Sequence, residues 1–205
     1  MDLYERYPAL CDAKRDIEAA ADALIAAFEA GGKLLLCGNG GSCADCEHIV
    51  GELMKGFMLK RPLPEATAQA MKSNCPELPD EWLARLQGGL PAISLPSAAA
   101  LNSAFCNDVD PALVYAQPLM GLAKKGDALL CISTSGNSEN VVAAAQVGKA
   151  LGLKVIALTG CGGGALGNVA DVCIRVPEQE TYKVQELHLP VYHHLCAQIE
   201  RYFFG

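Results

Sequence analysis

The sequence has few aromatic residues and no excess of positive charge. Aromatic side chains make up 6% of the 205 residues, although hydrophobic residues as a whole make up 51%. The core must therefore consist mainly of Ala, Leu, Val and Ile. The formal net charge is −7, whereas a general nucleic-acid binder needs a basic surface that displaces counterions from phosphates. We therefore expect no nucleic-acid partner, while a local pocket for an anionic metabolite remains compatible with this charge.

Long apolar runs are also missing. The longest ones, such as LPAISL at 90–95, are much shorter than the roughly 20 residues that a helix needs to cross a bilayer. The first 32 residues start acidic and show a helical period, without the apolar block of a signal peptide. These absences predict a cytoplasmic protein with no membrane partner.

Cysteine is abundant, but its distribution argues against a disulfide framework. Of the ten cysteines, Cys37, Cys131 and Cys173 lie inside apolar, strand-like runs, where a free cysteine packs as a small hydrophobic side chain. Reduced thiols of this kind are typical of a reducing compartment. Cys43 and Cys46 form one CxxC pair, but no second CxxC is present to complete a cysteine-rich zinc site. Redox or zinc chemistry at this pair is therefore the less favoured interpretation.

Apolar strand-like segments alternate with helical patterns along most of the chain. Expected strands are 33–37, 91–95, 126–133, 154–160 and 171–176. Expected helices are 4–30, 42–57, 97–107, 111–125, 141–152 and 181–202, with a loop or short helix at 160–170. Almost wholly apolar strands that alternate with helices are typical of a parallel sheet covered on both faces. The sequence therefore predicts a single α/β domain, in which ligands bind at the carboxyl ends of the strands.

The segment 58–90 differs from the rest of the chain. It contains four prolines, mixed charges and one expected short helix at 79–87. Such a segment could cap a pocket, extend an interface or alter the substrate. We treat it as an insert or cap within the single domain 1–205, which begins with the N-terminal helix at 1–31.

A loop rich in hydroxyl groups follows the expected strand 126–133. Four hydroxyl side chains fall within six residues, namely Ser133, Thr134, Ser135 and Ser138. Hydroxyls and free backbone N–H groups at the start of a helix form an anion site. A phosphate monoester fits best, because this stretch has neither a Walker lysine nor a GxGxxG pattern. The alternative is a solvated turn rich in helix-capping residues.

The glycine loop GNGGS at 38–42 precedes a second candidate site. Ser42 is expected to cap the following helix, on which His48 and Glu52 are four residues apart and share a face. Such a pair can chelate a metal ion, or divide into a ligand and a general base. An ordinary surface pair is the alternative.

The last expected helix carries three of the four histidines. Gln185 and His193 are eight residues apart, which places them about 80° apart around the helix axis, so both can face one site. His188 and His194 lie on the same helix, and a core position is the alternative for each histidine. Pro190 is expected to kink this helix and free a carbonyl group.

Together these segments resemble the sugar isomerase (SIS) domain family and, within it, the phosphoheptose isomerases. The matching pieces are CGNGGS…D..H…E from Cys37, ND at 107–108, ISTSGNS.NV, GLKVIALTG, AD..I.VP and the QE.H...YH pattern of the last helix. The resemblance covers nearly the whole chain. It implies a three-layer α/β/α sandwich with a five-stranded parallel sheet of the doubly wound, flavodoxin-like kind, in a homotetramer with active sites at subunit interfaces.

The resemblance also implies a reaction and roles for individual residues. The reaction is the isomerisation of sedoheptulose 7-phosphate to D-glycero-D-manno-heptose 7-phosphate through an enediolate. Glu52 matches the general base and His193 the general acid. The phosphate would be held by Ser133, Thr134, Ser135 and Ser138. The sugar site would be lined by Asn39, Gly40, Gly41, Ser42, Asn107, Asp108 and Gln185. One zinc ion would be held by His48, Glu52, Gln185 and His193.

Two departures from the family pattern leave other functions open. The segment 58–90 is longer than its equivalent in the family, and Tyr182 stands where several relatives carry an acidic residue. One alternative is an isomerase of another sugar phosphate. A different class is a non-catalytic SIS protein, either a sugar-phosphate sensor or a partner of a replication initiator. Glu52 and His193 favour an enzyme, because a scaffold has no chemical need for either.

Overall fold

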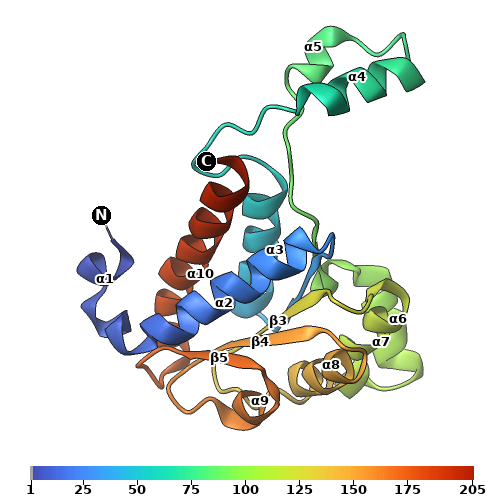
Figure 1. The fold of residues 1–205 in the computed structure, drawn as a ribbon. Coiled ribbons are helices and arrows are strands. Elements are labelled where there is room, and N and C mark those ends of the chain that lie inside the picture. Colours follow the sequence, from blue (N-terminus) through green and yellow to red (C-terminus); the bar gives the residue numbers. More distant parts are fainter. Residues whose placement is uncertain (1) are drawn as a thin grey trace.

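The computed structural model describes residues 2–205 and contains one five-stranded parallel sheet (Figure 1). The strand order is β2-β1-β3-β4-β5, and every neighbouring pair is parallel. The strands are β1 (Leu34–Gly38), β2 (Ala92–Ser94), β3 (Ala128–Ser133), β4 (Lys154–Thr159) and β5 (Val172–Arg175). This arrangement confirms the predicted three-layer α/β fold, and all five strands lie where the sequence predicts them.

The two faces of the sheet pack into two separate cores. In β1, Leu34 and Leu36 belong to one core, whereas Leu35 and Cys37 belong to the other, as the period of two in a strand requires. Every residue of β1 and of β3 is buried, which explains why these strands are continuous apolar runs rather than alternating ones.

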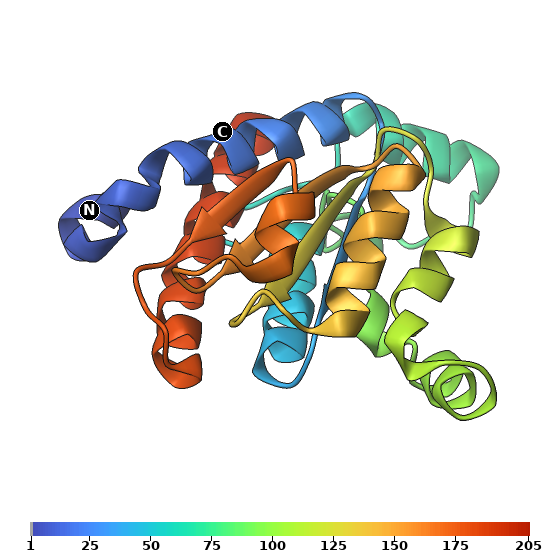
Figure 2. The same cartoon turned by 90° about the horizontal axis from the view of Figure 1, so that it is seen from below.

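Helices cover both faces of the sheet (Figure 2). On one face lie α2 (Lys14–Glu29), α3 (Gly41–Met54) and α10 (Thr181–Phe204). On the other lie α7 (Ala116–Leu122), α8 (Glu139–Ala150) and α9 (Gly164–Val169). The helix α6 (Ala99–Asp108) has no buried residue in the described chain. Within residues 2–205, none of the helices is both long enough and apolar enough to cross a membrane.

Several helix boundaries differ from the prediction for local physical reasons. The long N-terminal helix is confirmed from Pro8 as a 3₁₀ turn (Pro8–Ala13) followed by α2, but a short α1 (Leu3–Arg6) precedes it. The chain leaves the helical conformation at Tyr7, because a proline disfavours that conformation in the residue before it. The predicted helix at 111–125 divides into a 3₁₀ turn (Pro111–Leu113) and α7. Pro190 lies inside α10 without ending it.

The segment 58–90 forms a helical hairpin that projects from the body of the molecule (Figure 1). It contains α4 (Glu65–Asn74), which the sequence did not predict, and α5 (Asp80–Leu83) within the predicted short helix. Neither helix has a buried residue. The two arms meet at an antiparallel bridge between Pro62 and Gln87, and the backbone N–H of Gly88 donates to the carbonyl oxygen of Arg61 at 2.8 Å. The base of the hairpin is therefore closed by main-chain contacts.

Candidate active site

The glycine loop and the serine loop follow adjacent strands and are joined by side chains. Asn39 and Asn140 exchange two amide hydrogen bonds of 2.8 and 3.0 Å. The Tyr115 hydroxyl lies 3.0 Å from both the Gly38 carbonyl oxygen and Asn39 Oδ1. Because β1 pairs directly with β3, these bonds connect the end of β1 to the first turn of α8. The motif analysis singled out Asn39 but neither Asn140 nor Tyr115, which lie far from it in the sequence.

The glycine loop makes a sharp turn that starts α3. Gly40 has φ +54° and is the N-cap of α3, so Ser42 lies inside the first turn. The predicted capping role of Ser42 is therefore wrong, because the left-handed turn at Gly40 starts the helix two residues earlier. A Cβ atom on Gly41 would overlap the side-chain amide of Gln185. The absence of a side chain at Gly41 thus lets α10 place Gln185 directly against the loop.

The serine loop is held in shape by hydrogen bonds within it and by close packing against the segment that follows β4. The hydroxyls of Ser133 and Ser138 are 3.1 Å apart, and the backbone N–H of Asn137 donates to Ser135 Oγ at 3.1 Å. Gly136 has φ +67°, and a Cβ atom there would overlap the backbone of Gly163. The loop is therefore fixed against the segment that follows β4 before any ligand arrives.

The serine loop offers neutral hydrogen-bond donors at the start of a helix. Ser138 is the N-cap of α8, and its hydroxyl does not cap the helix. Helix geometry leaves the first amides of α8 without partners inside the helix, and the helix dipole favours an anion there. Hydroxyls and main-chain donors around a helix N-terminus are a suitable arrangement for a phosphate group.

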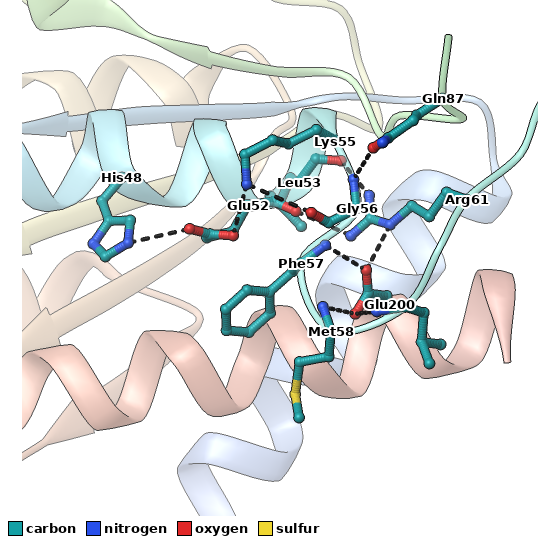
Figure 3. Close-up of polar contacts among 11 residues, drawn as sticks. His48, Glu52, Leu53, Lys55, Gly56, Phe57, Met58, Arg61, Gln87 and Glu200 are labelled. Atoms are coloured by element: carbon teal, nitrogen blue, oxygen red, sulfur yellow. Dashed lines mark hydrogen bonds and ion pairs between the residues drawn. The ribbon is translucent and has the colours of Figure 1, made fainter. Parts of the chain in front are cut away.

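Glu52 and His48 form the polar pair on α3 that their spacing predicts. His48 Nε2 lies 3.2 Å from Glu52 Oε1, and Lys55 Nζ lies 3.3 Å from Glu52 Oε2 (Figure 3). The Glu52 side chain is 13% exposed, compared with 42% for His48. The carboxylate is thus largely shielded but still reachable from solvent, as a general base requires.

His193 of α10 faces this pair. Its ring centroid lies 4.9 Å from that of His48 and 5.5 Å from that of Phe57. Its Nε2 atom is buried and has no hydrogen-bond partner in the described structure. Burial and the nearby His48 lower the pKa of His193, with Glu52 opposing them in part. The imidazole is therefore neutral near pH 7 and can either donate or accept a proton.

A buried tyrosine orients His48. The Tyr192 hydroxyl lies 2.9 Å from His48 Nδ1. Burial raises the pKa of nearby Asp45, although Tyr192 and the proximity of His48 oppose the rise. With Nδ1 engaged by Tyr192, the Nε2 atom of His48 faces Glu52. In the sequence, Tyr192 and Asp45 appeared only as single letters of the last-helix and glycine-loop motifs, with no role assigned.

The remaining predicted residues divide between the site and other parts of the molecule. Of the other histidines on α10, His188 is fully buried, and His194 packs against Tyr4 with ring centroids 5.8 Å apart. Asn107 and Asp108 end α6 with exposed side chains that bond to each other at 2.8 Å. The hydrogen bonds of these two side chains in the described structure do not reach either loop.

The donor set at α3 and α10 suits zinc in kind. Imidazole and carboxylate groups are common zinc ligands, and the partnerless Nε2 of His193 is a potential ligand atom. However, no group of three or more His, Cys, Asp or Glu side chains in residues 2–205 is close enough to hold a metal ion as it stands. The geometry here is that of the ion pair His48–Glu52 with the imidazole of His193 beside it, and these residues fit a zinc ion by chemistry.

Comparisons with known proteins agree with this arrangement. The model of the SIS domain matches residues 9–88 and 87–160. A phosphoheptose isomerase of Akkermansia muciniphila is 33% identical over 205 residues, which are 100% of this chain and 95% of that protein. Among solved structures, a phosphoheptose isomerase from Francisella tularensis superposes with a TM-score of 0.76 at 32% identity, covering 95% of this chain and 92% of the other. The enzyme from Neisseria gonorrhoeae superposes with a TM-score of 0.75 at 29% identity, covering 96% and 94%.

Proposed function

We propose that this chain, which belongs to the SIS domain family and within it to the phosphoheptose isomerases, converts sedoheptulose 7-phosphate to D-glycero-D-manno-heptose 7-phosphate. The observation that carries the proposal is that Glu52 and His193, from two different helices, both lie against His48. An aldose–ketose isomerase needs a base, a group that moves protons between oxygens, and an anchor for the phosphate. Glu52 would be the base, His193 would move the protons, and the serine loop would anchor the phosphate.

The reaction moves protons without any net change in composition. Glu52 removes a proton from C1 of the ketose, and the electron pair forms the double bond of an enediolate. His193 transfers a proton between the oxygens on C1 and C2, and the protonated Glu52 returns a proton to C2. The carbonyl is then at C1 and the product is the aldose. General acid–base catalysis of this kind contributes roughly 10²–10⁴-fold to the rate.

The serine loop anchors the far end of the substrate. Ser133, Thr134, Ser135 and Ser138 surround the N-terminus of α8, where a phosphate accepts hydrogen bonds from hydroxyls and backbone N–H groups. Fixing the phosphate limits which carbons can reach Glu52. Asn39, Gly40, Gly41, Ser42 and Gln185 would then line the sugar between the two ends. Asn107 and Asp108 stay part of the predicted sugar site.

A zinc ion is the predicted cofactor of the site. His48, Glu52, Gln185 and His193 would hold it, and when bound it supplies Lewis-acid polarisation of the carbonyl oxygen. A carboxylate bound tightly to a metal is a weaker base, so the ligand and base roles of Glu52 compete. We therefore expect loose ligation by Glu52. Metal analysis of the wild type against His48→Ala and Gln185→Ala tests the assignment, which fails if zinc content is unchanged.

The assembly and the compartment follow from the same proposal. We place the enzyme in a homotetramer with sites at subunit interfaces. In support, α6 has no buried residue, and large apolar side chains are exposed along 101–122, namely Leu101, Val109, Leu113, Met120 and Leu122. A cytoplasmic location is supported by ten free cysteines, as a reducing compartment would maintain.

Incubation of the purified protein with sedoheptulose 7-phosphate, with and without zinc, tests the proposal. We expect an aldoheptose phosphate, observed by NMR and mass spectrometry. Parallel incubation with five- and six-carbon ketose phosphates tests the alternative sugars that Tyr182 and the segment 58–90 leave open. If the sugar phosphate raises the melting temperature but no sugar is converted, the protein is a sensor and the enzymatic proposal is wrong.

A further inference from the structure

A buried ion pair lies behind the acid–base residues, between the base of the hairpin and α10. Arg61 Nε donates to Glu200 Oε1 at 2.8 Å, and each residue is 1% exposed (Figure 3). The guanidinium also lies over the ring of Phe204, 4.6 Å from its centroid. Buried ion pairs are costly to desolvate, and apolar pairs can often replace them. The presence of this ion pair therefore needs an explanation, which its other hydrogen bonds provide.

Arg61 bonds to the end of α3 that carries Glu52. Its Nη1 atom donates to the carbonyl oxygen of Leu53 at 2.7 Å, and Nη2 donates to the carbonyl oxygen of Glu52 at 3.0 Å. The last carbonyls of a helix have no partner within the helix, and a cation there is favoured by the helix dipole. The guanidinium therefore fixes the backbone from which the Glu52 side chain extends.

Glu200 organises the chain immediately after α3. Its carboxylate accepts the backbone N–H groups of Phe57, Met58 and Leu59 at 2.8, 2.7 and 3.1 Å. Burial alone would raise the pKa of Glu200, but these bonds and Arg61 lower it overall, so the group is ionised. Successive N–H groups around an anion form a rigid nest. This nest places the ring of Phe57 against His193.

We propose that Arg61 and Glu200 are positioning residues for both members of the acid–base pair. Arg61 holds Glu52 through the end of α3, and Glu200 holds His193 through Phe57. This inference rests on the proposed isomerase function. It explains why an ion pair is used here. Arg61 bonds to the main chain of Glu52, and Glu200 bonds to the main chain of Phe57, which packs against His193.

The chain contains a matched control in a second buried carboxylate, that of Asp127. Asp127 accepts hydrogen bonds from Lys33 Nζ at 2.6 Å and from the backbone N–H groups of Lys33 and Lys124 at 3.0 and 2.7 Å. The side chain of Asp127 is 2% exposed. It precedes β3, and its hydrogen bonds go to Lys33 and Lys124, not to Arg61, Glu200 or the end of α3. Asp127→Asn therefore removes a similar buried carboxylate without touching the site.

Steady-state kinetics of Arg61→Lys and Glu200→Gln, compared with Asp127→Asn, test the proposal. Arg61→Lys keeps the charge but cannot bond both carbonyls and the carboxylate at once. We expect kcat to fall about 10- to 100-fold, since small misplacements of reacting groups have effects of this size. KM should stay within about twofold, because the serine loop is separate. A loss of kcat no greater than that of Asp127→Asn, at a comparable fall in melting temperature, would overturn the proposal.

Two further measurements keep the proposal testable if a variant folds poorly or the wild type is inactive. Phe57→Leu leaves the ion pair intact but removes the aromatic ring that packs against His193. It should lower kcat and leave KM nearly unchanged. Hydrogen exchange needs no substrate: Arg61→Lys should speed exchange in 50–58 more than Asp127→Asn does. Unchanged exchange there would refute the positioning role. An inactive wild type with faster exchange in Arg61→Lys would refute the proposed function while supporting the positioning contacts.

Discussion

The carboxyl edge of the sheet and the projecting hairpin are built in opposite ways. At the sheet edge, loops distant in sequence are joined by paired side chains, such as Asn39 with Asn140. In the hairpin, neither α4 nor α5 buries a single residue. Only the base of the hairpin is tied to the body, through Arg61 and its neighbours. We therefore expect the hairpin to affect the proposed chemistry only through its base.

The largest effect should come from Glu52, near the end of α3. Glu52→Gln keeps the size of the side chain but removes the base, so kcat should fall about 10³-fold, within the range for loss of a general base. Assays of isomerisation measure this directly. Glu47→Gln on the exposed surface of the same helix is the control and should retain activity. Retention of most activity by Glu52→Gln would place the base elsewhere.

A second effect at the sheet edge separates binding from chemistry. Replacing Ser135 and Ser138 together by Ala removes two hydroxyl donors to the phosphate. Hydrogen bonds to charged groups contribute about 1.5–3 kcal/mol each, so the loss of both should raise KM by at least about 100-fold. Ser73→Ala in α4 is the matched change in the hairpin and should leave KM as it is. An unchanged KM in the double variant would show that the phosphate binds elsewhere.

Beneath the sheet edge, His188 should make stability depend on pH. Burial lowers its pKa from 6.5 to about 4, with the nearby backbone of Thr159 opposing the shift. The unfolded chain binds a proton at this residue near pH 6.5, whereas the folded chain does so only near pH 4. The free energy of unfolding should therefore fall as the pH drops between these values, by up to about 3 kcal/mol from this residue.

Urea denaturation at pH 7, 5 and 4 measures this dependence. His193 and His194 also have lowered pKa values from burial, so the contribution of His188 is the difference between the wild type and His188→Gln. That variant should lose less stability on acidification than the wild type does. Equal losses in the two proteins would contradict the assignment.

The smallest effect should come from removing the hairpin. Pro62 and Gln87 already form an antiparallel bridge, so Asn-Gly in place of residues 63–86 can close the chain with a two-residue turn. With Arg61 and Glu200 retained, kcat and KM should both stay within about twofold of the wild type. A large rise in KM would show that the hairpin caps the pocket, and a changed oligomeric mass would show that it extends an interface.

Local patterns predicted the strands and most of the site from the sequence. The strands could be predicted because each is a short apolar run between polar loops. The pair His48–Glu52 could be predicted because its spacing of four residues lies within one helix. The serine loop was visible for the same reason, since its hydroxyls are consecutive or nearly so.

Long-range pairings could not be predicted in this way. Arg61 and Glu200 are 139 residues apart in the chain, and no periodicity links them. Asn140 and Tyr192 are letters of the quoted family motifs, but their contacts with Asn39 and His48 became visible only in the structure. The helix α4 was missed because it has no buried face to create a periodic apolar pattern. Sequence therefore suggested which residues to propose as reacting groups, but not the contacts that hold them.

Isomerisation in deuterated water most directly tests the central claim that Glu52 moves the proton through an enediolate. The wild type and Glu52→Gln would be incubated with sedoheptulose 7-phosphate, and product and remaining substrate would be analysed by NMR and mass spectrometry. The account predicts deuterium on the carbon beside the carbonyl with the wild type, and neither conversion nor exchange with Glu52→Gln. Exchange at an undiminished rate in Glu52→Gln would contradict it.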